Sequence, residues 1–70
     1  MDEVLTPRQR KIAALVSEGL TNGEIAERLA ITKGTVDNHL RMIRRRLGLR
    51  NRVQLAVWAA LHGLYRSEPG

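Results

Sequence analysis

The sequence predicts an all-α domain, a four-helix bundle-like arrangement within 70 residues. Four tetrapeptides that begin with Thr or Asn suit a helix N-terminus, and each precedes a segment whose apolar residues recur every three or four positions. Glycine follows three of these segments, where it suits the left-handed backbone beyond a helix. No stretch alternates apolar and polar residues for long enough to indicate a strand. We expect one domain over residues 1–70, with an ordered core at about 5–65 and loose ends at 1–4 and 66–70.

The first two helices are expected at about 7–18 and 22–29. Thr6-Pro7-Arg8-Gln9 supplies a capping hydroxyl, a proline at the first helical position and a glutamine three residues after the cap. Thr21-Asn22-Gly23-Glu24 repeats the pattern with a glutamate. The apolar residues whose spacing turns them inward are Ile12, Leu15, Val16, Leu20, Ile25, Ala26 and Leu29.

The third helix is expected at about 33–47, after a Thr32 cap, with Ile31 filling the turn before it. One face carries an apolar stripe at intervals of four, three and four, formed by Val36, Leu40, Ile43 and Leu47. The opposite face must then look outward, and it carries Lys33, Gly34, Asp37, Asn38, Arg41, Arg44 and Arg45. The second and third helices, joined by a short turn, form a helix-turn-helix.

The fourth helix is expected at about 52–63, after Asn51-Arg52-Val53-Gln54. Its core contacts are assigned to Ala56 and Ala60, with Leu49 closing the preceding loop. A second apolar stripe recurs on this helix, and it is formed by Val53, Val57 and Leu61 with Trp58 adding area. This stripe either packs on the first helix or serves as a dimer interface; a contact this small would be weak without DNA.

Positive charge is concentrated in one part of the chain. Between Lys33 and Arg52, seven basic residues stand against Asp37 alone, whereas the remainder of the chain has a net charge of −1. A basic stretch can be a solvated helix face, but nothing acidic compensates this one, which favours an anionic partner. Arg outnumbers Lys here, and guanidinium groups suit phosphates and guanine edges.

Other classes of function find little support. The chain has no cysteine and two separate histidines, so no metal site is expected. His39 lies on the supporting side of the third helix, where a packed, hydrogen-bonded structural histidine is expected, and His62 lies near the end of the fourth. No nucleophile–base pair or glycine-rich phosphate loop is present, so we predict neither an enzyme, a cofactor nor a small-molecule ligand. No apolar run reaches the roughly 20 residues of a membrane span, and the acidic start differs from a secretory signal, so a cytoplasmic location is expected.

Several short motifs together are similar to a known family. They are Leu5-Thr6-Pro7-Arg8, Gly19-Leu20-Thr21-Asn22, Glu24-Ile25-Ala26, Thr35-Val36, His39, Leu47-Gly48 and Asn51-Arg52. Over about residues 5–64 the chain resembles the LuxR/GerE-type helix-turn-helix domain, the DNA-binding end of NarL/FixJ response regulators and quorum-sensing activators. The resemblance implies double-stranded DNA as the partner, the third helix in the major groove and a homodimer through the fourth helix. RNA polymerase is a further candidate partner.

The resemblance also implies roles for individual residues. Asp37, Asn38 and Arg41 resemble the positions that contact bases or, for Arg41, a phosphate. Thr21, Asn22 and Thr35 resemble phosphate contacts, and the neighbouring charges extend the backbone-contacting set to Lys33, Arg44, Arg45, Arg50 and Arg52. The family often carries lysine at positions 23, 34 and 37, where this chain has Gly23, Gly34 and Asp37. We therefore expect attraction to DNA from the later turns of the third helix and selectivity from the earlier ones.

Three roles are possible for Asp37. Its carboxylate can accept from the amino group of cytosine, it can orient Arg41 one turn later, or it can be a solvated group near a helix start. Asn38 suits the two hydrogen-bonding groups of an adenine edge, and the alternative is a polar surface residue that contacts no base.

The sequence thus predicts a sequence-specific DNA-binding domain of a bacterial-type transcription regulator. Two alternatives remain, a promoter-binding module like region 4 of a sigma factor and a basic protein-interaction module. The fourth helix argues against the first, and the polar outer face of the third helix argues against the second.

Overall fold

The computed structural model describes residues 5–63, and these residues form four helices without a strand. The helices are α1 (Pro7–Ser17), α2 (Asn22–Leu29), α3 (Lys33–Leu47) and α4 (Arg52–Leu61). The predicted all-α class and the order of the elements are confirmed. The first helix ends one residue, and the fourth two residues, before the predicted limit. The expectations about residues 1–4 and 64–70 lie outside the described residues.

Side-chain caps account for the places where the helices begin. The Thr6 hydroxyl accepts from the Gln9 amide at 3.1 Å and the Gln9 side chain accepts in return from the Thr6 amide at 3.2 Å, which is a complete capping box. Thr21 and Glu24 form the same pair of bonds at the start of α2. Thr32 and Asn51 cap α3 and α4 with one bond each to the amide three residues later. Local sequence therefore sets all four starts.

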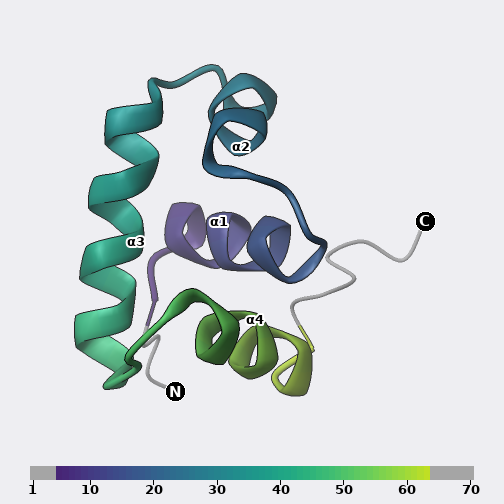
Figure 1. Cartoon of the computed structure of the whole chain (residues 1–70), viewed down its shortest axis with the longest axis vertical. Coiled ribbons are helices and arrows are strands. Elements are labelled where there is room, and N and C mark those ends of the chain that lie inside the picture. The colour runs from purple at the N-terminus through teal and green to yellow at the C-terminus, as the bar shows by residue number, and fades with distance from the viewer. Residues whose placement is uncertain (1–4, 64–70) are drawn as a thin grey trace.

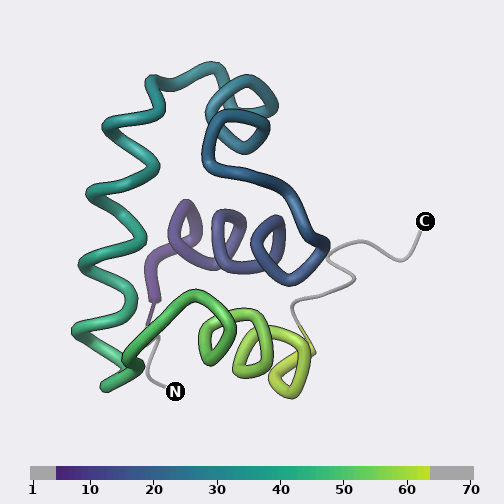
Figure 2. The backbone as a smooth tube through the Cα atoms, viewed as in Figure 1, coloured from purple at the N-terminus to yellow at the C-terminus, as the bar shows by residue number. Residues whose placement is uncertain are grey.

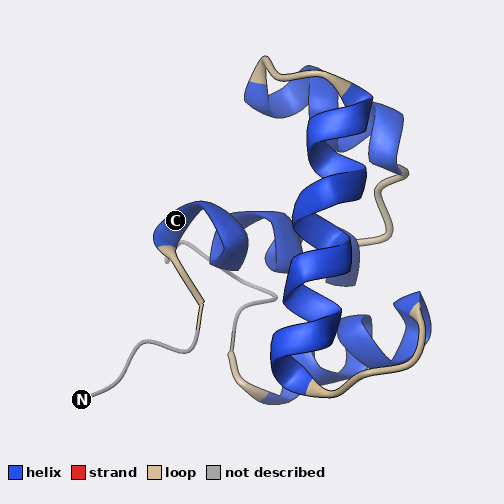
Figure 3. Ribbon diagram, turned by 90° about the vertical axis from the view of Figure 1, so that its left-hand side faces the viewer, coloured by secondary structure: helices blue, strands red, loops and turns tan. Residues whose placement is uncertain are grey.

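The helices are arranged around α1. Figure 1 shows α3 as a long upright helix against which α1 and α4 lie crosswise, with α2 at its upper end, and the tube in Figure 2 traces the same path. Helix α1 contacts α2, α3 and α4. The view in Figure 3 shows α3 along its length in front of the other helices, so one side of α3 faces away from the core.

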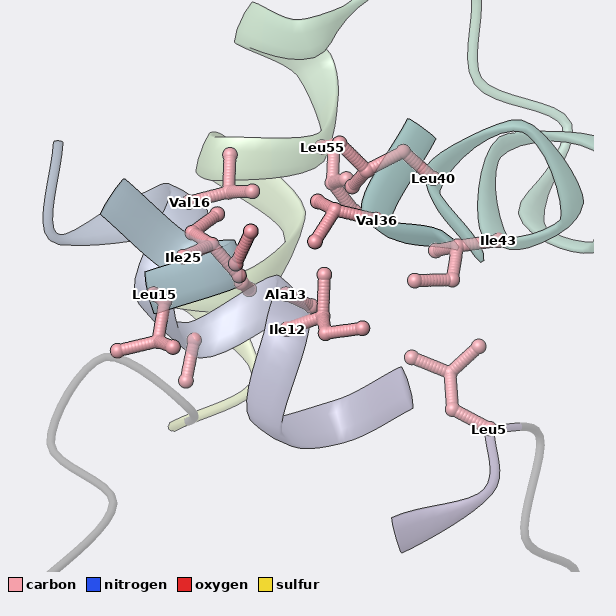
Figure 4. Close-up of a cluster of buried hydrophobic side chains, with 13 residues drawn as sticks. Leu5, Ile12, Ala13, Leu15, Val16, Ile25, Val36, Leu40, Ile43 and Leu55 are labelled. Carbon is pink, nitrogen blue, oxygen red and sulfur yellow. The ribbon is translucent and has the colours of Figure 1, made fainter. Parts of the chain in front are cut away.

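The core is aliphatic and draws on every helix. Figure 4 shows the cluster, in which Val36 and Leu40 of α3 project toward the same apolar interior as Leu55 of α4. The predicted inward residues of the first three helices are buried or partly buried, as are Ile31 and Leu49 in the connections. The core also takes in side chains that were not predicted, namely Leu5, Ala13, Ala14, Leu55 and Ala59.

The predicted inward face of α4 was right for Ala56, which packs partly buried against the core, and wrong for Ala60, which is exposed. Leu55 and Ala59 are fully buried, whereas Ala56 is only partly buried and Ala60 is exposed. Helix α4 is apolar around most of its circumference, so apolar spacing alone does not select a face. The larger Leu55 side chain fills the space beneath α1 better than an alanine could.

The turn between α2 and α3 contains a strained residue. Ala30 ends α2 in the left-handed region at φ 59°, where its side chain costs about 1 kcal/mol relative to glycine. Its amide and that of Ile31 bond back to carbonyls of α2, and the buried part of Ile31 holds the turn against the core. This tight turn fixes the angle at which α3 leaves α2.

Candidate nucleic-acid interface

Helix α3 is divided into a buried and an exposed side. Val36 and Ile43 are fully buried and Leu40 nearly so, which fixes the helix to α1 and α2. The opposite side is exposed, and it carries Lys33, Gly34, Thr35, Asp37, Asn38, Arg41 and Arg45. The outward face predicted from the sequence is thus present except for Arg44, which is partly buried.

Asn38 and Arg41 contact each other one turn apart. Arg41 donates from Nη2 to Oδ1 of Asn38 at 2.6 Å, and both residues are exposed. A guanidinium has only donors, so this bond leaves the Asn38 amide nitrogen and the other guanidinium hydrogens directed to solvent. The pair presents a row of donors on the outer face of α3.

Asp37 is turned toward α2 instead of toward Arg41. Its Oδ1 accepts from Nδ2 of Asn22 at 2.6 Å, across 15 residues of sequence. The predicted alternative in which Asp37 orients Arg41 is therefore not found, because Arg41 bonds to Asn38. Asp37 is exposed, but its carboxylate is hydrogen-bonded to Asn22. The predicted alternative of a carboxylate that is only solvated is therefore not found either.

Asn22 also binds the first residue of α4. Arg52 donates from Nη1 to Oδ1 of Asn22 at 2.5 Å and from Nη2 to the carbonyl oxygen of Leu20 at 2.6 Å. Both Asn22 and Arg52 are partly buried. Together with the bond to Asp37, these bonds connect the starts of α2 and α4 and the second turn of α3 through one amide. Nothing in the sequence signals this contact, because Arg52 lies 30 residues from Asn22.

The residues predicted to contact the DNA backbone differ in their surroundings. Thr21, Lys33, Thr35, Arg45 and Arg50 are exposed. The hydroxyls of Thr21 and Thr35 already take part in helix caps, the latter 2.8 Å from the Thr32 hydroxyl. Their positions at the first turns of α2 and α3 leave backbone amides near the same surface, where an anion is favoured.

Two predicted arginines face inward. Arg44 donates from Nη2 to the carbonyl oxygen of Arg50 at 3.2 Å, and its Nε is buried with no acceptor among the described residues. Arg52 is held by Asn22 and Leu20 as described above. Arg44 thus stabilises the connection between α3 and α4, and Arg52 ties the start of α4 to the connection between α1 and α2, so part of the predicted cluster has a structural contact within the protein.

A pocket of about 290 Å³ opens beside the middle of α3. Three guanidinium groups surround it and two leucines form its apolar part; the lining consists of Asn22, Asp37, Leu40, Arg41, Arg44, Arg52 and Leu55. Guanidinium groups around a concave surface suit an anion such as a phosphodiester, whereas Asp37 opposes one. The guanidinium groups of the pocket therefore attract an anion, while the Asp37 carboxylate repels one.

The outer face of α4 is apolar and exposed. Val53, Val57 and Leu61 are 70%, 52% and 78% exposed, which contradicts the alternative that this stripe packs on the first helix. Trp58, which was assigned to the same interface, is partly buried against the core. Its ring stacks on His62 with the centroids 4.0 Å apart. Only the three aliphatic residues therefore form an unpartnered apolar stripe.

The two histidines lie apart in the chain and have different surroundings. His39 is partly buried as expected, but its Nδ1 has no hydrogen-bond partner within residues 5–63, so this atom does not supply the hydrogen bond expected for the side chain. The His62 Nδ1 lies 2.9 Å from the Trp58 carbonyl oxygen.

In the described part of the chain no three His, Cys, Asp or Glu side chains form a group that could hold a metal ion. None of the described helices is long and apolar enough to span a membrane.

Several known proteins are similar in sequence to this chain over most of its length. A family profile described as bacterial regulatory proteins, luxR family, matches residues 3–59. An HTH-type transcriptional regulator of Mycobacterium bovis is 49% identical over 59 residues, which cover 84% of this chain and 7% of that protein. The nitrate/nitrite response regulator protein NarL of Escherichia coli is 46% identical over 54 residues, 77% of this chain and 25% of NarL. The DNA-binding transcriptional activator DevR/DosR of Mycobacterium tuberculosis is 42% identical over 65 residues, 93% of this chain and 29% of that protein. The chain thus spans less than a third of the length of these relatives.

Proposed function

Because the chain belongs to the luxR family of bacterial regulatory proteins, we propose that it binds specific sequences of double-stranded DNA with α3 in the major groove. Membership in the family implies DNA-binding transcription regulation and not enzymatic catalysis. The groove assignment, the residues that carry it and the assembly on DNA are our proposal. The family match also favours this function over a sigma-factor module.

The observation that carries the proposal is the two-sided character of α3. Its apolar side is buried through Val36, Leu40 and Ile43, while polar side chains occupy the exposed side. The major groove of B-DNA is wide enough to admit one α-helix, and base edges there are distinguished by hydrogen-bonding side chains. A dry protein interface would favour apolar and aromatic groups at its centre, whereas Met42 is the one large apolar side chain exposed on α3 and the rest of the exposed side is polar or charged.

We divide the contacts between base edges and the DNA backbone. Asp37 and Asn38 lie in the first half of α3, where the recognition helix of a helix-turn-helix contacts bases, and Arg41 lies at its middle. The exposed backbone-contacting set is Thr21, Lys33, Thr35, Arg45 and Arg50. Arg44 borders the pocket and would reach a phosphate through its remaining guanidinium hydrogens. Asn22 would contact a phosphate through its main-chain amide at the start of α2, since its side chain is occupied.

We also propose that two copies bind adjacent half-sites through α4. The exposed stripe of Val53, Val57 and Leu61 is self-complementary when two α4 helices meet about a twofold axis. Trp58 borders the stripe and would contribute its exposed part. Such a contact is small, so the homodimer would form mainly on DNA. The setting is the cytoplasm, where RNA polymerase would be a further partner of the bound regulator.

Selection from a pool of random duplexes, followed by an electrophoretic shift assay, tests the proposal. We expect enrichment of one short motif. In the shift assay, the affinity of the protein for a duplex with this motif should exceed its affinity for random duplex by about 10³-fold or more at physiological salt. Equal binding to all duplexes would contradict sequence-specific recognition. Absence of any shift, together with binding to an acidic protein, would instead support the protein-interaction alternative.

A further inference from the structure

The side chain of Asn22 lies between a cation and an anion. Its Oδ1 accepts from Arg52 at 2.5 Å and its Nδ2 donates to Asp37 at 2.6 Å. A guanidinium can only donate and an ionised carboxylate can only accept, so the amide has one orientation that satisfies both neighbours. The bond to Arg52 therefore determines which end of the amide faces Asp37.

Arg52 is itself held at two points. Its second terminal nitrogen donates to the carbonyl oxygen of Leu20, in the connection between α1 and α2. Asn22 and Arg52 are partly buried, whereas Asp37 is exposed on α3. The supporting end of this chain of bonds is thus partly buried, and the supported end is exposed on the proposed DNA-contacting face.

This arrangement restricts the Asp37 carboxylate. Arg41 lies one turn further along α3, and an aspartate free to move would pair with it. The bond to Asn22 draws the carboxylate toward α2, while Arg41 bonds to Asn38. The two opposite charges are therefore kept separate, and each remains available to a base edge.

We propose that Asn22 and Arg52 are positioning residues that hold Asp37 as a selective acceptor for the amino group of cytosine. Oδ1 of Asp37 is bonded to Asn22, and no donor within residues 5–63 is assigned to Oδ2, which is the atom left to accept from the base. Carboxylates in the major groove accept from cytosine N4. This inference rests on the proposed DNA binding and changes the role of two side chains from phosphate contact to internal support.

Asp37 has a second effect on selectivity. A fixed negative charge among Arg41, Arg44 and Arg52 repels phosphates that are not aligned with the recognition helix. Binding to random sequence is mainly electrostatic, so the carboxylate lowers it, whereas the correct base compensates by donating a hydrogen bond. Asp37 thus favours one sequence partly by disfavouring the others.

Four variants separate positioning from mere stability. Asp37→Ala removes the acceptor, Asn22→Ala removes the link, and Asn22→Asp keeps a partner for Arg52 but turns an acceptor toward Asp37. Arg45→Ala is the matched control, because Arg45 is exposed on the same helix and forms no part of the chain of bonds. For each folded variant, selection from random duplexes gives the base preference, and titration with a random duplex gives the non-specific affinity.

For the wild-type protein we expect one position of the selected motif to be cytosine, preferred over other bases by roughly tenfold. Asp37→Ala should abolish that preference and raise non-specific affinity a few-fold. Asn22→Ala and Asn22→Asp should weaken the same preference without this gain, because the carboxylate remains. The double variant with Asp37→Ala and Asn22→Ala should have the same base preference as Asp37→Ala alone, because the two residues act through one contact. Arg45→Ala should lower affinity for all sequences and leave the preference unchanged.

The outcomes distinguish this inference from the function on which it rests. If the wild-type protein selects a motif but Asp37→Ala alters no position, Asp37 does not contact a base and the inference fails while DNA recognition stands. If Asp37→Ala removes a preference that both Asn22 variants retain, the positioning role is wrong. If the wild-type protein selects no motif, the proposed function itself fails. A fall in thermal stability of the Asn22 variants without a change in base preference would show a structural role alone.

Discussion

Arg41 and Asn38 hold each other on the exposed face of α3, with Nη2 of Arg41 donating to Oδ1 of Asn38 at 2.6 Å. Two of the three side chains that we assign to base contacts are therefore paired in the free protein. An asparagine that recognises adenine needs both its oxygen and its nitrogen. On DNA, Asn38 must either release Arg41 or use its nitrogen alone while it orients Arg41 toward a neighbouring base.

Replacing Asn38 by Ala should relax selectivity at one or two base positions. The variant loses the amide contact, worth about 1–3 kcal/mol of discrimination, and frees Arg41 from its partner. Arg45→Ala should instead weaken binding to all sequences by a similar factor. Affinities for a set of single-base variants of the selected site provide the measurement. If both substitutions reduced every affinity equally, the division between base and backbone contacts would be wrong.

Binding should depend steeply on salt. If about five phosphates are neutralised per copy, the slope of log affinity against log salt concentration should be about −4 to −5. Arg50→Ala should reduce the magnitude of the slope by about one, since Arg50 is exposed and belongs to the backbone-contacting set. Titrations at several salt concentrations test both values. A slope near zero would exclude a mainly electrostatic contact with DNA.

The apolar stripe on α4 should be needed for paired binding. Leu61 is 78% exposed, so Leu61→Glu leaves the core intact but places a charge in the proposed contact. We expect the affinity for two adjacent half-sites to fall by at least about tenfold, or 1.4 kcal/mol, with little change on a single half-site. Arg28→Gln is the control, because it changes the net charge by the same amount at an exposed position on α2. Unchanged cooperativity in Leu61→Glu would argue against α4 as the dimer interface.

Two glycines should respond oppositely to alanine. Gly34 lies in the first turn of α3, and an added Cβ would meet only the Thr32 hydroxyl at 3.9 Å, so Gly34→Ala should stabilise the fold by about 0.4–1 kcal/mol. Gly48 ends α3 in the left-handed region at φ 70°, and Gly48→Ala should cost about 1 kcal/mol or more. Thermal and urea unfolding monitored by circular dichroism would measure both changes. Destabilisation by Gly34→Ala would mean that the start of α3 is more restricted than its surroundings indicate.

The sequence by itself determined where each helix begins and which side of α3 is exposed. Both depend on residues close together in the chain: a cap acts on an amide three positions later, and a stripe such as Val36, Leu40 and Ile43 repeats with each turn. The family resemblance arises from the same local motifs.

Only the tertiary structure decided which side of α4 enters the core and how Asp37 is held. Helix α4 is apolar on several sides, so the shape of the space beside α1 selects Leu55 and Ala59 over Ala56 and Ala60. Asp37 and Arg52 meet opposite ends of the Asn22 amide only after the starts of α2 and α4 come together with the second turn of α3. Spacing along the chain carries no information about such a contact, because its geometry depends on how the helices pack.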